Sequence, residues 1–263
     1  MKKNNIEINL LTMMLIEAII LLFFFKESLL NILISSIIVL FLLPLINHFK
    51  RNKLFDVITL LISFFIIFFL IKEISIFITY NLLKYYSTTL IVISIIITTL
   101  IVTKNGYHTF IKTLEICSYF YLLIKLISFI LIIPNIDITN FNNTLLTELT
   151  INNHLIYITL FLLFILISIK SITNKLPNNK MYTLSFINPL IMKTIIILVI
   201  GKTLFNIYPY PYVNVLKRIK YLDFIERMEG ILSFEYLFCF FFTISFFTIV
   251  IKNVLKKVLE FLV

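Results

Sequence analysis

Five ionisable side chains lie within or at the ends of long apolar stretches of this sequence: Glu17, Glu115, Lys125, Lys193 and Lys202. A charge inside a hydrocarbon layer is costly, so such residues usually face the protein interior and mark a site for an ion or a solute. Glu17 and Lys125 stand midway along their stretches. A carboxylate there suits an ammonium group or a coupling cation, and a lysine suits a carboxylate or pairs with the acid. We therefore take Glu17, Glu115 and Lys125 as candidate ligand or coupling residues.

The remaining polar residues have simpler interpretations. Glu17 could also be a partnered packing residue, and we expect Lys193 and Lys202 to reach the membrane interfaces along their flexible stems. His48, His108 and His154 lie at the ends of apolar stretches, so we expect no metal site. No CxxC, HExxH, GxGxxG or P-loop pattern and no clustered Ser, His and Asp set occurs. We predict a protein that is not an enzyme and needs no cofactor.

The composition is that of a membrane protein. The chain is 60% hydrophobic and only 14% charged, whereas soluble domains contain about 45–50% apolar and about 25% charged residues. The apolarity is continuous, which excludes a membrane β-barrel, whose strands alternate in polarity, and leaves helices. We predict one all-α domain over 1–263, a polytopic transmembrane helix bundle of about eight spans. The expected apolar segments are 10–25, 29–47, 54–71, 88–103, 116–133, 154–169, 187–208 and 233–251, and the third could continue to Leu83.

Basic residues predict the orientation of these spans. With the N-terminus inside, the inner segments hold thirteen lysines and arginines, whereas the outer segment 134–153 has none. Cytoplasmic segments of membrane proteins carry such an excess, so we predict cytoplasmic N- and C-termini. The net charge of +10 then reflects topology and contact with membrane lipid, not a nucleic-acid partner. We expect Pro44, Pro134 and Pro189 to mark span boundaries.

Segment 209–231 departs from this charge rule. The predicted topology puts it on the outer side of the membrane, yet it is rich in basic residues. Its pattern fits an amphipathic helix over 213–229, with Val215, Ile219 and Leu222 on one side. Asp223 and Arg227 are spaced to pair at i, i+4 on that helix. We therefore expect a folded segment along the outer membrane surface and not a free loop.

Two stretches resemble motifs of the spore-germination permease family, the GerAB-type B subunits of nutrient germinant receptors. Gly106-Tyr-His-Thr-Phe-Ile-Lys112-Thr-Leu-Glu115-Ile is similar to the family's Gly-x-x-x-x-x-Arg-x-x-Glu-Ile pattern at the start of a middle helix. The second is similar to the block that precedes the family's final helix. Its matching residues are Gly201, Tyr210-Pro211, Lys217-Arg218-Ile219 and Asp223 to Glu229, with Glu226-Arg227 at its centre. The resemblance is clearest over 106–253. Because a charged pair facing lipid would be costly, we expect Lys112 and Glu115 to face the bundle interior.

The resemblance implies a fold, partners and a role. The family has about ten helices in the inverted-repeat fold of amino acid–polyamine–organocation transporters, so this chain would be a shortened form of that LeuT-type permease. It would lie in the inner membrane of a bacterial spore, sense a small nutrient such as an amino acid or sugar, and signal to A-type and C-type subunits. Two alternatives stay open: a secondary transporter for amino acids or similar solutes, and a degenerate or structural membrane protein that binds no ligand.

Overall fold

The computed structural model describes residues 2–48, 53–81, 87–140, 148, 150–218 and 233–260, and these residues form helices and no strands. The elements are α1 (Lys2–Ile19), the π-helix η1 (Ile20–Phe24), α2 (Leu29–His48), α3 (Lys53–Asn81), α4 (Thr88–Lys104), α5 (Tyr107–Ile132), the 3₁₀-helix η2 (Ile133–Asn135), α7 (His154–Thr173), α8 (Asn179–Ile200), α9 (Lys202–Ile207), α10 (Pro211–Arg218) and α12 (Phe234–Glu260). The prediction of an all-α bundle is confirmed.

Seven of the described helices are long and apolar enough to cross a membrane. The eighth apolar helix, α4, has 17 residues, which at about 1.5 Å per residue span about 25 Å. That length falls short of a hydrocarbon core of about 30 Å. The expected eight segments are thus present, and one of them is short.

Several predicted boundaries were wrong. The third helix does continue past Lys72 and Glu73 to Asn81, but the fifth begins at Tyr107, well before residue 116. The segment expected over 187–208 is two helices, α8 and α9, which meet at Gly201. Pro189 lies inside α8 and Pro44 inside α2, so neither marks a boundary. Pro134 does, because it begins the short η2 turn after α5.

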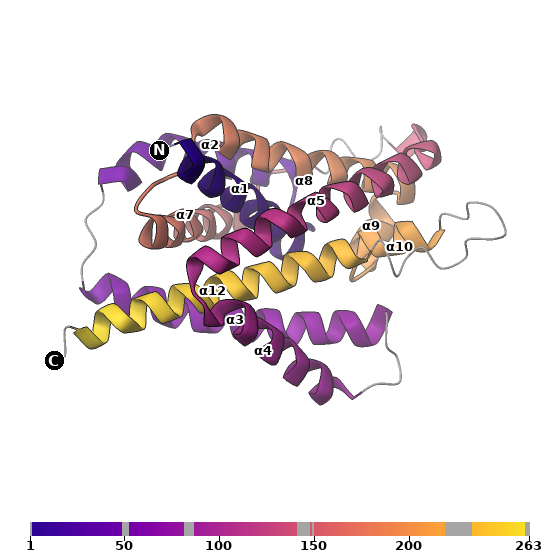
Figure 1. Cartoon of the computed structure of the whole chain (residues 1–263). Coiled ribbons are helices and arrows are strands. Elements are labelled where there is room, and N and C mark those ends of the chain that lie inside the picture. The colour runs from indigo at the N-terminus through magenta and orange to yellow at the C-terminus, as the bar shows by residue number, and fades with distance from the viewer. Residues whose placement is uncertain are drawn as a thin grey trace.

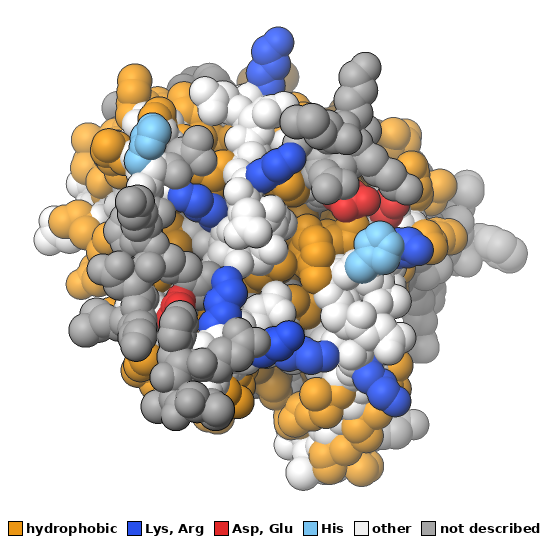
Figure 2. Space-filling view, turned by 60° about the vertical axis from the view of Figure 1, so that its left-hand side comes forward, with side chains coloured by type: hydrophobic (Ala, Val, Ile, Leu, Met, Phe, Trp, Pro, Cys, Tyr) orange, Lys and Arg blue, Asp and Glu red, His pale blue; other side chains and the backbone are white. Residues whose placement is uncertain are grey.

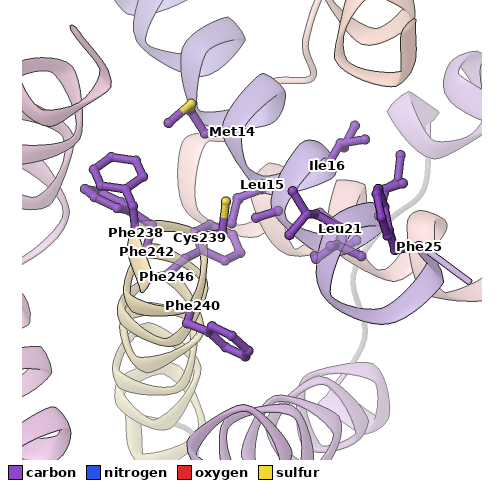
Figure 3. Close-up of a cluster of buried hydrophobic side chains, with 14 of the residues drawn as sticks. Met14, Leu15, Ile16, Leu21, Phe25, Phe238, Cys239, Phe240, Phe242 and Phe246 are labelled. Atoms are coloured by element: carbon purple, nitrogen blue, oxygen red, sulfur yellow. The ribbon is translucent and has the colours of Figure 1, made fainter. Parts of the chain in front are cut away.

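Helices α12 and α1 form the centre of the bundle. α12 packs against α1, α3, α4, α5 and α7 and runs through the middle of the assembly (Figure 1). Within their apolar windows, 78% of α12 and 61% of α1 are buried, against 28% of α3 and of α5. Leu15 of α1 lies beside Cys239 of α12 (Figure 3). A charge on the buried part of α1 or α12 therefore has little access to lipid.

The outer helices expose apolar side chains, as a bundle in lipid requires. Phe65 and Phe68 on α3 are 71% and 72% exposed, and Tyr119 on α5 is 70% exposed. Such surfaces on a water-soluble protein would cause aggregation. Figure 2 turns forward the end where α1 begins and α12 ends, and lysine side chains gather there amid apolar surface. The protein is an integral membrane protein, and its orientation remains a prediction.

Two glycines of the described bundle lie between helices, and they share a backbone conformation but differ in the space around them. Gly106 and Gly201 have φ of +84° and +75°, with ψ of −170° and 156°, a region that only glycine adopts without strain of about 1–3 kcal/mol. A Cβ on Gly106 meets nothing within 4 Å, whereas a Cβ on Gly201 lies 3.2 Å from Asn140 Oδ1. The Asn140 amide donates to the Leu198 carbonyl at 2.9 Å, so its side chain is held in place.

We expect Gly201→Ala to lower the free energy of unfolding more than Gly106→Ala does, because it adds a close contact to the same backbone strain. Thermal unfolding of both variants in detergent checks this order. Equal midpoints for the two variants would show that Asn140 moves aside at no cost.

Candidate functional site: a charge cluster inside the bundle

Three charged side chains from three helices meet inside the bundle. Glu17 comes from α1, Lys125 from α5 and Glu235 from α12, and they are 0%, 6% and 0% exposed. Each helix brings its charge inward because apolar residues on the same face pack in the core, as Leu114 and Tyr121 do on α5. We call Glu17, Lys125 and Glu235 the buried charge cluster.

Glu17 is fully partnered. It forms an ion pair with Lys125, and the Tyr121 hydroxyl donates to its Oε1 at 2.8 Å. The Asn188 side-chain amide on α8 donates to Oε1 and Oε2 at 3.2 and 3.3 Å. The structure places Glu17 and Lys125 inside the bundle and pairs them, which is one of the two roles considered for the lysine. A buried ion pair with additional hydrogen bonds can offset much of its desolvation cost.

Glu235 was missed by the sequence analysis. It stands second in α12, where an acid usually only marks the start of a helix. Here α10 and α5 cover that helix end. The Tyr212 hydroxyl on α10 donates to Glu235 Oε2 at 2.5 Å, while Oε1 lies 3.9 Å from Lys125 Nζ. One feature of the sequence could have indicated its burial. Glu235 is the one charged residue in the aromatic-rich stretch Phe-Glu-Tyr-Leu-Phe-Cys-Phe.

A cavity of about 150 Å³ lies beside the buried charge cluster, near the end of the bundle. Its wall includes Leu21, one helical turn after Glu17, and Tyr236, next to Glu235. Two opposite charges line it, Lys26 and Glu73. The remaining lining residues are Leu22, Phe23, Phe25, Pro209, Tyr210, Pro211 and Phe240. Two of the helices that carry cluster residues therefore also form the cavity wall.

The backbone at this cavity departs from α-helical geometry. Residues Ile20–Phe24 form a π-helix directly after α1, and such turns occur frequently at functional sites. The first helical segment contains no glycine. The structure places the irregular turn there without glycine, and it precedes the Lys26 side chain that lines the cavity.

Tyr210 supplies a hydroxyl to the same cavity, from the segment between α9 and α10. Burial raises the pKa of Tyr210 to about 12, and the nearby carboxylate of Glu73 contributes. The hydroxyl therefore stays protonated at physiological pH and can donate a hydrogen bond. Its ring packs edge-on against Phe77 with centroids 5.0 Å apart, which fixes its position.

A second charged group, around Glu148, joins four segments of the chain at one end of the bundle. Lys193 on α8 and Lys202 on α9 both pair with Glu148, which also accepts the Leu29 N–H at 2.9 Å. Lys193 also donates to the Glu27 carbonyl and is fully buried. The expectation that Lys193 snorkels to the interface was wrong, because Glu148 folds in to neutralise it. Lys202 also pairs with this acid, with 22% of its side chain exposed.

The first family-like motif does not lie in the site. Lys112 and Glu115 on α5 are both exposed, so the expectation that they face the bundle interior was wrong. Their neighbours Ile111 and Leu114 take the inward positions instead. Gly106 does precede the helix start at Tyr107, as expected.

The second motif is described only in part. Gly201 separates α8 from α9, and Pro211 begins α10 beside the cavity. In α10, Val215 is buried and Lys217 is exposed, as the amphipathic prediction requires. Arg218 ends the described part of this helix, and nothing can be said of its side chain. The Asp223–Arg227 pair and the Glu226-Arg227 motif lie outside the described residues.

The described residues contain no group of three or more His, Cys, Asp or Glu side chains that could hold a metal ion. No protein-family model, curated protein or solved structure matches the chain. Fold and site together define the class: an all-α, polytopic integral membrane protein with a charge cluster in its interior.

Proposed function

We propose that this chain is a permease-like membrane protein that senses a small nutrient, as the B subunit of a spore germinant receptor. In this role it works with A-type and C-type subunits in the spore inner membrane. The motifs around Gly106 and Pro211 support the family, and the buried charge cluster supports a bundle with more than a packing role. Charged residues inside membrane spans are rare and usually functional.

One observation carries the sensing role: the cavity wall includes residues of η1, which directly continues α1, and of α12, and α1 and α12 hold Glu17 and Glu235. Leu21 follows Glu17 by one turn, and Tyr236 follows Glu235 directly. A solute in the cavity would contact Leu21 and Tyr236, which follow Glu17 and Glu235 in the chain. Binding energy can then favour one packing of α1 against α12, which is how a ligand shifts a two-state bundle.

The size and charge of the cavity restrict the solute. A volume of about 150 Å³ matches a cavity that admits benzene and lies below the 300–1,000 Å³ typical of sites for larger ligands. Lys26 suits a carboxylate, Glu73 suits an ammonium group, and Tyr210 adds a donor. A small zwitterionic amino acid fits this set better than a sugar, which has no charges for Lys26 and Glu73 to pair with.

Calorimetry of the purified protein in lipid nanodiscs tests this proposal with glycine, alanine and glucose. We expect the amino acids to bind, and Glu73→Gln to weaken their binding about 10- to 100-fold. That range corresponds to about 1.5–3 kcal/mol for a hydrogen bond to a charged group. Lys72→Met is the matched control, because Lys72 is the exposed neighbour of Glu73 and does not line the cavity.

Each contrary outcome has a clear meaning. Equal binding by wild type and Glu73→Gln would place the solute elsewhere, and the absence of binding would favour the structural alternative. Secondary transport remains a second candidate, because Glu17 and Lys125 form an intramembrane charge pair of the kind that couples ion and solute movement. Uptake of labelled amino acid into proteoliposomes by this chain alone would favour transport over sensing.

A further inference from the structure

The buried charge cluster has unequal numbers of opposite charges. It contains two carboxylates, Glu17 and Glu235, and one ammonium group, Lys125. Its other polar members, Tyr121, Tyr212 and Asn188, are neutral hydrogen-bond donors. With both acids ionised, the cluster would carry one uncompensated negative charge in a low-dielectric interior. An isolated buried charge is strongly disfavoured and is usually neutralised by a counter-ion or a proton.

The hydrogen bonds and ion pairs of the two carboxylates show which of them lacks a positive partner. Both oxygens of Glu17 accept hydrogen bonds, and Lys125 pairs with it. Glu235 Oε2 accepts the Tyr212 hydroxyl, but its Oε1 has no hydrogen-bond partner among the described residues. Lys125 lies 3.9 Å from that oxygen, which is beyond hydrogen-bond distance. A buried oxygen without a partner is exceptional in native proteins and calls for an explanation, such as a catalytic role or a bound water or ion.

The groups around Glu235 favour a proton over a metal ion at this position. Those that face it or stand beside it are Lys125 and Tyr121 of α5, Tyr212 of α10, Glu17 of α1, and Tyr236 and Cys239 of α12 itself. The phenols and the thiol are protonated donors. Magnesium and calcium ions require about six or more oxygen ligands, and the described residues include no group of three or more His, Cys, Asp or Glu side chains that could hold a metal ion. A proton needs a single oxygen.

We propose that Glu235 is a proton-binding site of the bundle and is protonated at neutral pH while Glu17 stays ionised against Lys125. The proton comes from water and forms an O–H bond at the carboxyl group, which leaves the cluster with no net charge. This assignment is independent of whether a solute occupies the neighbouring cavity.

Infrared spectroscopy of the purified protein in nanodiscs at pH 7 tests the proposal, because a protonated carboxyl group has its own C=O stretching band. We expect wild type to show this band, with the shift on transfer to D₂O that an O–H group produces. The band should be absent from Glu235→Gln and unchanged in Glu115→Gln. Glu115 is the matched control, because it is exposed on α5 away from the cluster.

Four results would overturn the proposal. Wild type could lack the band, a result that needs no variant to fold. The band could persist in Glu235→Gln, or it could disappear in Glu17→Gln while persisting in Glu235→Gln, which would put the proton on the wrong acid. Loss of the wild-type band on adding sodium or potassium chloride at fixed pH would make a metal ion the occupant instead.

Discussion

Replacing Lys125 with methionine is expected to lower the free energy of unfolding by about 3–5 kcal/mol, the cost of leaving a buried charge without its partner. Glu17 and Glu235 would then face each other as two acids with no cation between them. Methionine keeps the volume and the apolar stem of lysine, so the loss reports charge and not packing. Chemical unfolding in mixed detergent micelles, followed by circular dichroism, measures the difference.

Lys112→Met is the control for Lys125→Met. Both lysines are on α5, but Lys112 is exposed and Lys125 is buried. We expect the exposed substitution to change the free energy of unfolding by less than about 0.5 kcal/mol, as surface substitutions usually do. Similar losses in the two variants would mean that Lys125 contributes no more than an exposed lysine.

The second large effect is expected at Glu148, which joins the segment before α7 to α8, α9 and the start of α2. Glu148→Gln removes the charge that neutralises Lys193 and Lys202, and Lys193 is fully buried. We expect a loss of about 3 kcal/mol in the free energy of unfolding, again from an unpaired buried charge. Glu27→Gln should cost less than about 1 kcal/mol, because its ion pair with His154 is on the surface.

The same carboxylate gives the protein a predictable response to acid. Burial alone would raise the pKa of Glu148, but Lys193, Lys202 and the Leu29 N–H outweigh it and hold the pKa below its ordinary value of 4.5. The folded protein thus binds this proton more weakly than the unfolded chain. The stabilisation is present above pH 4.5 and is lost as the pH falls below it. Wild type should lose stability over that range more steeply than Glu148→Gln does, and parallel curves would contradict this.

The helices and two of the three cluster residues could be predicted from the sequence. Continuous apolarity leaves the backbone no alternative to helices in lipid. Glu17 and Lys125 stand so deep in their segments that neither can reach water, so an inward position follows. The end of α8 was harder to predict from the sequence. Apolar residues continue on both sides of Gly201, and only the backbone angle of that glycine separates α8 from α9.

The errors concern residues whose environment depends on distant segments. Lys193 is near enough to the end of its helix to reach water, and its burial depends on Glu148 from another part of the chain. Glu235 looks like an ordinary helix-start acid until α10 covers it. The prediction for Glu115 was wrong in the opposite direction, because its place at the start of an apolar segment does not reveal that it lies on the outer face of α5. Helix rotation and packing partners were the missing information.

The central claim is that Glu17 and Lys125 act as one unit inside the membrane. A double-mutant cycle of Glu17→Gln, Lys125→Met and the combined variant tests it most directly, with the free energy of unfolding as the readout. Because the combined variant removes both charges of the pair, we expect it to be more stable than Lys125→Met alone, with a coupling free energy above about 1 kcal/mol. Additive losses, with no coupling between the two positions, would contradict the account.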